Sequence, residues 1–217
     1  MKILIFGDVH GNLIALERLV KLEQSQVDFF VCHGDIVNYG PWTNECVRLL
    51  NDIPNVFVLK GNHEKYFIDG FYDGTNIVAR ASFEKCYASF DKSLVKVLDQ
   101  YENQFQIDDF IIRHTIENRY IYANTNIADL KIDCNYIIGH SHQQFEGELN
   151  DYKLYNTGSL GQNRQFINKS CYLILNTDTK KVEFKSYIFD IKKVINEMKV
   201  QNYPQICIDY YLSKQQL

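Results

Sequence analysis

The first sixty residues alternate short apolar runs with amphipathic segments, and no other feature limits the fold as strongly. Apolar runs at 3–6, 28–32 and 55–59 predict three strands buried on both faces. Between them, the apolar spacing over 13–23 and within the proline-bounded segment 41–54 predicts two helices. Strands joined by helices pair in parallel through right-handed crossovers, so we assign the chain to the α/β class.

The pattern changes twice after this unit. Residues 66–104 predict two helices, the second capped by Asp91, and we expect this insertion to form a lid over a site. Further strands are predicted at 110–113, 135–138, 152–155, 171–175 and 182–187. Their close spacing indicates a second, partly antiparallel sheet. Two last helices are expected, one after Asp190 and one over 204–212.

Length and composition exclude several classes of protein. The 217 residues are predicted to form a single domain over 1–217, with no linker or repeat. A net charge of −4 lacks the basic excess of a nucleic-acid or membrane-surface binder, so we expect no stable nucleic-acid complex. Six cysteines are scattered without C-x-x-C spacing, and no apolar run approaches the roughly 18 residues of a membrane span. These features indicate reduced thiols, no membrane association and a cytoplasmic location.

Residues able to bind metals follow five of the predicted strands. In chain order the clusters are Gly7-Asp8-Val9-His10, Gly34-Asp35, Gly61-Asn62-His63-Glu64, His114 and Gly139-His140-Ser141-His142. Because ligands of α/β sheets bind beyond the carboxyl ends of the strands, we expect all five clusters to meet at one place. Asp8 and His10 are two residues apart, so both leave the same face of an extended segment and can bind one ion. The same holds for His140 and His142.

These candidate ligands are too many for one tetrahedral ion. Two aspartates, several histidines and the amide oxygen of Asn62 suit two ions about 3.5 to 4 Å apart, which clamp the attacking and leaving oxygens of a phosphate ester. Imidazole and oxygen ligands without thiolate favour manganese, iron, nickel or zinc. These ligand types do not choose among the four metals. We expect two divalent transition-metal ions and take manganese as the first candidate.

The order of the five clusters resembles the motifs of the calcineurin-like metallophosphoesterases. Segments 34–41 and 156–162 also resemble the small bacterial branch of that family, so the resemblance covers nearly the whole chain. It implies a four-layer α/β/β/α sandwich with mixed sheets and a helical insertion.

The resemblance also implies a role for each residue. Two sets of metal ligands are implied, the first being Asp8, His10 and His142 and the second Asn62, His114 and His140. Asp35 would bridge the two ions. His63 would lie outside both metal shells, where it would donate a hydrogen bond to the phosphate or a proton to the leaving oxygen.

The chain departs from the family pattern near the substrate. Asn38 and Tyr39 stand where the protein serine/threonine phosphatase branch has an acid and an arginine, so a charged partner for His63 and a phosphate-binding arginine are missing there. Arg164 is the candidate that restores a positive charge to substrate binding, with an ordinary surface arginine as the alternative. Thr115 follows His114 where many relatives have glycine.

Two other residues near the clusters have simpler interpretations. His33 matches no ligand spacing, so we interpret it as structural. Glu64 either orients its loop or simply begins a helix, where a carboxylate is favourable.

The predicted function is hydrolysis of a phosphate ester at two metals. Its substrate could be a phosphodiester, a dinucleoside polyphosphate or a phosphomonoester, and a nuclease is less favoured because the chain is acidic and short. The insertion carries six aromatic residues: Phe67, Phe71, Tyr72, Phe83, Tyr87 and Phe90. One or two of these rings facing the cleft would stack on a nucleobase or aryl group, so we expect a small, nucleotide-like partner. The alternative is a metal-binding but non-catalytic interaction module of the same fold, which a missing ligand would favour; no ligand is missing here.

Overall fold

Three parallel strands from the first sixty residues form the centre of a first sheet in the computed structural model, which describes residues 1–217. These strands are β1 (Lys2–Phe6), β2 (Phe29–Cys32) and β3 (Val56–Val58). They are connected by α1 (Leu13–Glu23) and α2 (Thr43–Asp52). Both strand pairs, β1 with β2 and β2 with β3, are parallel, which confirms the predicted β-α-β-α-β unit.

Two late strands complete the first sheet. β9 (Lys169–Asn176) pairs antiparallel with β1, and β10 (Lys181–Ile188) pairs antiparallel with β9, giving the order β10-β9-β1-β2-β3. The sequence assigned these two strands to the second sheet, and that assignment is wrong. Local spacing predicts the hairpin but carries no information about its partner, which lies about 170 residues earlier in the register Leu4↔Ile174.

The second sheet is also mixed and has the order β4-β5-β6-β8-β7. Its parallel centre consists of β5 (Phe110–Arg113), β6 (Asn135–Ile138) and β8 (Tyr152–Thr157). The antiparallel edge strands β4 (Gln104–Ile107) and β7 (Gln144–Leu149) were not predicted. Both are short, rich in polar residues and only partly buried, so they lack the apolar run by which the other strands are recognised.

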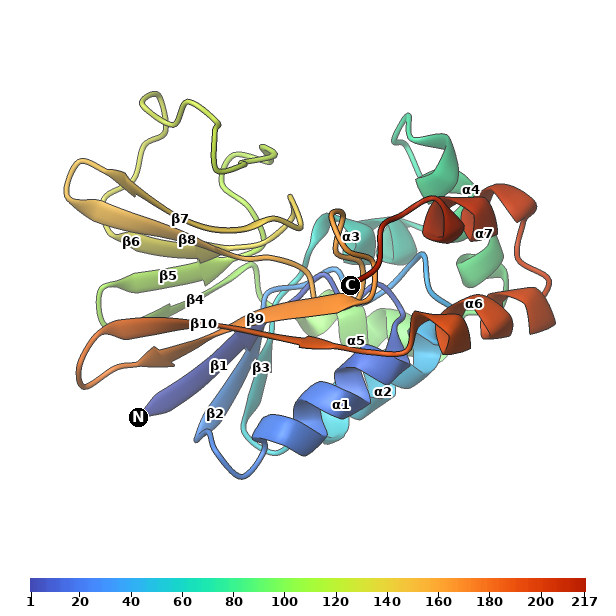
Figure 1. The fold of residues 1–217 in the computed structure, drawn as a ribbon, viewed down its shortest axis with the longest axis horizontal. Coiled ribbons are helices and arrows are strands. Elements are labelled where there is room, and N and C mark those ends of the chain that lie inside the picture. Colours follow the sequence, from blue (N-terminus) through green and yellow to red (C-terminus); the bar gives the residue numbers. More distant parts are fainter.

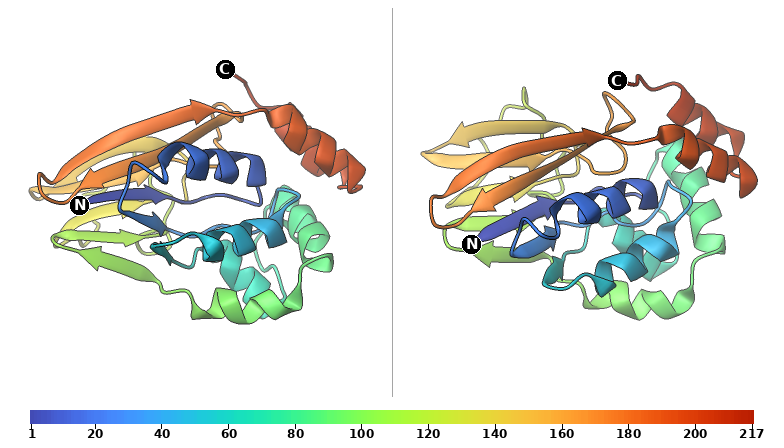
Figure 2. Two further views of the ribbon diagram at one scale, coloured as in Figure 1. Left: turned by 90° about the horizontal axis from the view of Figure 1, so that it is seen from below. Right: turned by 60° about the horizontal axis from the view of Figure 1, so that its bottom comes forward.

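The two sheets pack face to face with a further layer on each side (Figure 1). Ile5 and Val31 of the first sheet meet Ile112 and Ile137 of the second in one buried cluster. The other face of the first sheet is covered by α1 and α2, as the view from below shows (Figure 2). The outer face of the second sheet is covered by residues 114–134, which form turns rather than helices. The α/β sandwich of two mixed sheets is confirmed, with an irregular fourth layer.

The insertion contains three α-helices instead of the predicted two: α3 (Asn62–Asp69), α4 (Ile77–Ala88) and α5 (Val95–Gln100). Asp91 caps the short 3-10 turn η1 (Lys92–Leu94) that precedes α5. The insertion's role as a lid remains a prediction.

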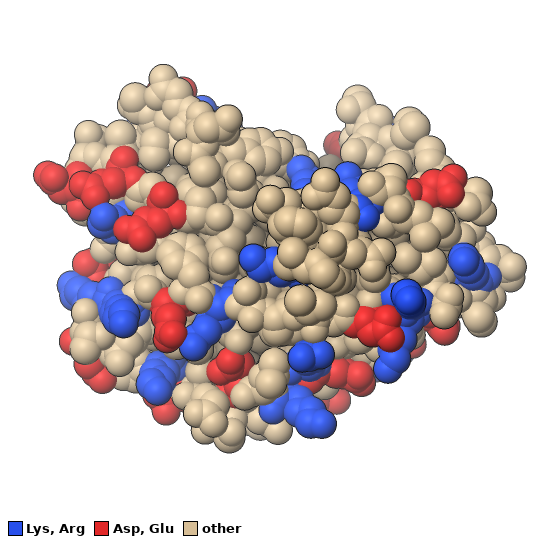
Figure 3. Space-filling model, viewed as in Figure 1, with Lys and Arg blue, Asp and Glu red and all other residues tan.

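The C-terminal helices close the same end of the molecule. They are α6 (Ile191–Val200), which begins after Asp190 as predicted, and α7 (Gln205–Leu212), which packs on α4. None of the helices has both the length and the apolar character that crossing a bilayer requires. In the space-filling view, a notch separates the lobe at the upper left from the helical lobe at the upper right (Figure 3).

Candidate functional site

All five clusters meet at the carboxyl ends of the parallel strands. The loops that follow β1, β2 and β3 come from the first sheet, and the loops that follow β5 and β6 come from the second. Donor atoms from these loops form three overlapping groups, within each of which all atoms lie within 4.8 Å of one another. The predicted convergence of the five loops is therefore present, with both sheets contributing.

Several of these side chains are carried by left-handed backbone. The φ angles are 49° at Asp8, 48° at His10, 54° at Asp35, 68° at His140 and 60° at His142. Non-glycine residues seldom adopt positive φ, and such strained positions concentrate at functional sites. Hydrogen bonds from the surrounding backbone stabilise these strained conformations. For example, the N–H of Asp8 donates to Gly34 O over 2.9 Å.

The first donor group joins Asp8, His10 and His142. His142 Nε2 lies 3.4 Å from Asp8 Oδ1 and 3.1 Å from His10 Nε2. The other ring nitrogen of each histidine faces a carbonyl oxygen, Gln162 O at 2.6 Å for His142 and Val37 O at 3.4 Å for His10. In each ring this contact places the proton on Nδ1. The Nε2 lone pairs of both histidines are then directed at the centre of the group.

An orphaned oxygen supports a cation in this group. Asp8 is fully buried, yet its Oδ1 has no hydrogen-bond partner, whereas its Oδ2 accepts from the backbone N–H of His140 at 3.0 Å. A buried carboxylate oxygen without a partner is costly unless a positive charge compensates it. The donors present therefore fit a divalent ion.

The second donor group joins Asp35, His114 and His140, with Asn62 beside them. His114 Nε2 lies 3.3 Å from Asp35 Oδ2, 3.0 Å from His140 Nδ1 and 3.0 Å from Asn62 Oδ1. Asp35 also faces the first group, because its Oδ2 is 3.9 Å from His10 Nε2. The third donor group, His10, Asp35 and His63, links the other two, so Asp35 lies between them. This donor set is consistent with a dinuclear metal site.

The electrostatics of the site favour bound cations. Burial opposes the charge of Asp8 and Asp35, but the adjacent histidines outweigh it and hold the pKa of both carboxyls well below the usual range. Burial lowers the pKa of His140 to about 3, so this ring is neutral. Burial also opposes protonation of His114, but Asp35 raises its pKa to about 9. A divalent ion in the second group would take the place of that proton.

Asn38, three residues after Asp35, is the hydrogen-bond partner of His63. Asn38 Oδ1 accepts from the N–H of Tyr39 at 2.7 Å, and Asn38 Nδ2 donates to Ala79 O at 3.3 Å. These two backbone groups fix which end of the amide is nitrogen, and that nitrogen lies 2.9 Å from His63 Nδ1. Nδ1 therefore accepts, and the ring proton is on Nε2, which is 3.9 Å from Asp35 Oδ2.

Glu64 organises the loop that carries Asp35. Its carboxylate is fully buried and accepts four backbone N–H groups, from Asp35 and Gly61 at Oε2 and from Ile36 and Val37 at Oε1, over 2.7–3.2 Å. Burial and Asp35 raise the pKa of Glu64 to about 7. Because all four neighbours are donors, a proton on the carboxyl would have no acceptor, and the ionised form fits the geometry. Of the two interpretations of Glu64, orienting the loop is the one that these bonds support, although the residue also lies in the first turn of α3.

His33 is structural, as the sequence indicated, and it explains two of the glycines. Its ring is fully buried beneath the donor groups and contacts Thr157 Oγ1 through Nε2 at 2.7 Å. A Cβ on Gly7 would lie 2.2 Å from His33 Nδ1, and a Cβ on Gly139 would lie 2.0 Å from His33 Cε1. Both positions before the ligands must therefore be glycine while this ring is present.

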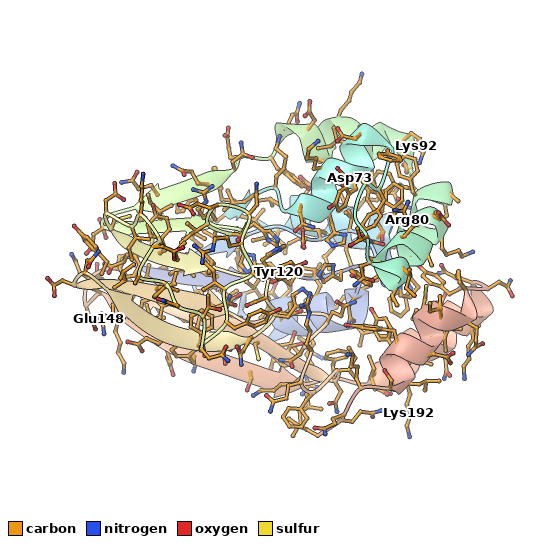
Figure 4. All side chains as sticks on the ribbon, turned by 90° about the horizontal axis from the view of Figure 1, so that it is seen from above. Asp73, Arg80, Lys92, Tyr120, Glu148 and Lys192 are labelled. Atoms are coloured by element: carbon orange, nitrogen blue, oxygen red, sulfur yellow. The ribbon has the colours of Figure 1, made fainter.

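Two clefts open beside the donor groups. The larger, of about 690 Å³, is lined by Asn62, His114 and His140 and by the rings of Tyr66 and Tyr120. The smaller, of about 450 Å³, is lined by His142, Tyr122 and Arg164 among others. Tyr120 lies near the middle of the molecule seen from above (Figure 4), where its ring stacks on that of His140 with centroids 3.9 Å apart.

Comparison with known proteins identifies the family of the chain. The calcineurin-like phosphoesterase model matches residues 1–185. The chain belongs to this family. An uncharacterised protein of Methanocaldococcus jannaschii is 29% identical over 237 residues, with 94% of each chain covered. A metallophosphoesterase structure from Sphaerobacter thermophilus is 27% identical, covers 98% of both chains and superposes with a TM-score of 0.79.

Shorter stretches resemble two other phosphoesterases. A symmetrical bis(5'-nucleosyl)-tetraphosphatase of Coxiella burnetii is 36% identical over 66 residues, 30% of this chain and 23% of that one. Serine/threonine-protein phosphatase 2 of Escherichia coli is 30% identical over 125 residues, 57% and 53% of the two chains. The family model and the donor groups identify a metal-dependent phosphoesterase, and these partial matches do not select its substrate.

The calcineurin-like site contains residues that the sequence did not reveal. Tyr120 and Tyr66 line the larger cleft, whereas none of the six aromatic residues named for the insertion does, so that expectation is wrong. Phe67, Phe83, Tyr87 and their neighbours pack against one another instead. Tyr120 lies in an irregular segment without periodicity, so no sequence signal marks it. Asn38 could have been found from its spacing, since the sequence already pointed to its position as the partner of His63.

Proposed function

We propose that this phosphoesterase hydrolyses nucleotide or aryl phosphodiesters and dinucleoside polyphosphates in preference to phosphopeptides. In this proposal the first ion is bound by Asp8, His10 and His142, and the second by Asn62, His114 and His140. Asp35 would help to hold both ions, and His63 would stand outside both sets of ligands. When bound, two divalent ions, manganese being our first candidate, neutralise phosphate charge and supply the nucleophile for hydrolysis.

The main argument for this substrate preference is the direction of the hydrogen bond between Asn38 and His63. Because Asn38 donates to Nδ1, His63 presents an N–H at Nε2 and acts as a neutral hydrogen-bond donor towards the substrate. An acidic partner in place of Asn38 would instead favour a charged ring that can give up a proton. A neutral donor suits leaving groups that are stable as anions, such as aryl oxides and phosphates, better than the alkoxide of a phosphorylated serine.

The surroundings of the phosphate support the same substrates. Tyr39 occupies the place of the phosphate-binding arginine, and its buried ring packs edge-on against His10 with centroids 4.9 Å apart. It therefore supplies no fixed charge for a monoester dianion. In the larger cleft, Tyr66 and Tyr120 offer aromatic surface to a base or aryl ring, where stacking contributes about 1 to 3 kcal/mol per base. The cytoplasm, inferred from the cysteines of the sequence, is our proposed location.

A substrate panel tests this proposal. Metal-free protein is reconstituted with manganese and assayed with a nucleotide aryl diester, diadenosine tetraphosphate and a phosphoserine peptide at one metal loading. We expect kcat/KM to be highest for the first two. A clear preference for the phosphopeptide would overturn the substrate assignment and leave the metal site standing. Stoichiometric metal without hydrolysis of any substrate would instead favour the non-catalytic module.

A further inference from the structure

The smaller cleft carries positive charge that nothing in the protein neutralises. It is lined by Arg164 and Lys169 and by no acidic residue. The remaining residues along its wall are neutral or imidazole side chains, namely Tyr122, Ser141, His142, Gln143, Gln144, Asn163, Gln165 and Cys171. Neither cation forms an ion pair, although the protein contains ten ion pairs that involve lysine or arginine side chains or the N-terminal amine. The lining of this cleft is therefore positively charged, although the chain as a whole carries a net charge of −4.

Arg164 is held in position at the rim of this cleft. Its guanidinium lies over the ring of Tyr120, 5.4 Å from the centroid, and Nη1 donates to the hydroxyl of Tyr122 over 3.3 Å. Both tyrosines belong to the segment that covers the second sheet, so Arg164 spans the boundary between the two clefts. A planar guanidinium placed in this way keeps donors free for an anion.

The larger cleft has a different charge pattern. Its lining includes three basic residues and three acidic ones, namely Lys60, Lys65, Arg113, Asp69, Asp73 and Asp99. Lys60 Nζ lies 3.8 Å from Asp99 Oδ1, and Lys65 pairs with Asp69. This cleft also touches the second donor group through Asn62, His114 and His140, whereas the smaller cleft touches the first group through His142. The dinuclear centre therefore lies between a mixed-charge, aromatic cleft and a purely basic one.

We infer that the smaller cleft is a subsite for a second phosphate group of the substrate, bound by Arg164 and Lys169. This inference rests on the proposed function and narrows it to substrates with more than one phosphate, of which dinucleoside polyphosphates are the class that fills both clefts. The scissile phosphate lies at the donor groups, a nucleoside occupies the larger cleft, and the remaining phosphates extend towards Lys169.

Lys169→Gln and Arg164→Gln test the subsite against a pair of substrates. Diadenosine tetraphosphate carries additional phosphates, and bis(p-nitrophenyl) phosphate carries one. We expect each variant to lower the ratio of their kcat/KM values, tetraphosphate over aryl diester, by roughly tenfold, the loss typical of one charged hydrogen bond. Lys192→Gln is the matched control, because Lys192 is also free of ion pairs but is exposed on α6, well away from Tyr120 (Figure 4). It should leave the ratio unchanged.

Two further measurements separate charge from shape. Arg164→Lys keeps the charge and should recover part of the ratio. The KM of the wild-type protein for the tetraphosphate should rise with ionic strength, and more steeply than that of Lys169→Gln.

The outcomes distinguish this inference from the proposed function. If the protein cleaves both substrates and the glutamine variants lower both kcat/KM values equally, or neither, the subsite is refuted and the phosphodiesterase activity stands. Cleavage of the aryl diester without cleavage of the tetraphosphate would also refute the subsite and leave the phosphodiesterase activity standing. Failure to cleave either substrate with both metals bound would refute the proposed function, and the subsite with it.

Discussion

The buried carboxylate of Glu64 offers the sharpest test of how the site is built. Glu64→Gln keeps the size of the side chain and replaces one carboxylate oxygen by an NH₂ group. Each oxygen of Glu64 accepts two backbone N–H groups, so either orientation of the amide turns two hydrogen bonds into donor–donor contacts. The loop from Asp35 to Val37 would lose half of the bonds through which this side chain holds it.

The expected loss follows from these contacts. Two buried N–H groups are left without an acceptor, and each such group costs about 1 to 3 kcal/mol, so the free energy of unfolding should fall by about 2 to 6 kcal/mol. A domain of this kind is stable by only about 5 to 15 kcal/mol, so the effect is large. Because Asp35 lies on the same loop, the variant should also retain less metal.

Urea unfolding of the metal-free protein measures the first effect, and metal analysis after reconstitution measures the second. Glu84→Gln is the control, since Glu84 is exposed on α4 and its side chain forms no hydrogen bond or ion pair. It should stay within about 0.5 kcal/mol of the wild type, as surface substitutions do. If Glu64→Gln also stayed within that range, the four hydrogen bonds would not be what holds the loop.

Three further outcomes are expected. Purified protein should bind about two transition-metal ions per chain, and a chelator should abolish hydrolysis reversibly; activity that persists without metal would exclude the two-metal mechanism. Asp35→Asn should lose both metal and rate, whereas His63→Ala should keep metal and lose rate roughly 100- to 10,000-fold; an empty site in His63→Ala would instead make His63 a ligand, as its place in one donor group allows. Gly7→Ala should destabilise the protein by about 1 to 3 kcal/mol, because its Cβ meets the ring of His33, and adding His33→Ala should remove most of that penalty. Additive losses in the double variant, measured by urea unfolding, would show that the ring is not the obstacle.

The sequence predicted the parts of the fold that depend on local pattern. β1 and β2 were recognisable as continuous apolar runs. The helix α6 was recognisable because its apolar residues recur at helical spacing after the capping residue Asp190. β4 and β7 were missed because edge strands are half exposed and need no continuous apolar run. The place of β9 in the first sheet depends on pairing with a strand at the other end of the chain, which no local pattern encodes.

Some features of the site could likewise be predicted from the sequence, and others could not. Convergence of the five clusters follows from the topology of parallel strands, so the donor residues could be named from the sequence. The direction of the Asn38–His63 hydrogen bond could not be predicted, because it is set by the N–H of Tyr39 and by Ala79 O, which lies 41 residues away in the sequence. The role of Tyr120 depends on the path of an irregular segment, which only the folded chain defines.

The central position of β1 has a consequence for how the protein forms during synthesis. One edge of β1 can pair with β2 soon after both emerge from the ribosome, but its other edge must wait for β9. Until residue 176 is exposed, an apolar strand with unpaired N–H and C=O groups is available to other chains. His140 and His142 also arrive late, so metal cannot stabilise the early half of the chain. Contacts across such long stretches of sequence slow folding, and the nascent protein therefore passes through a long period in which it is open to aggregation and to chaperones.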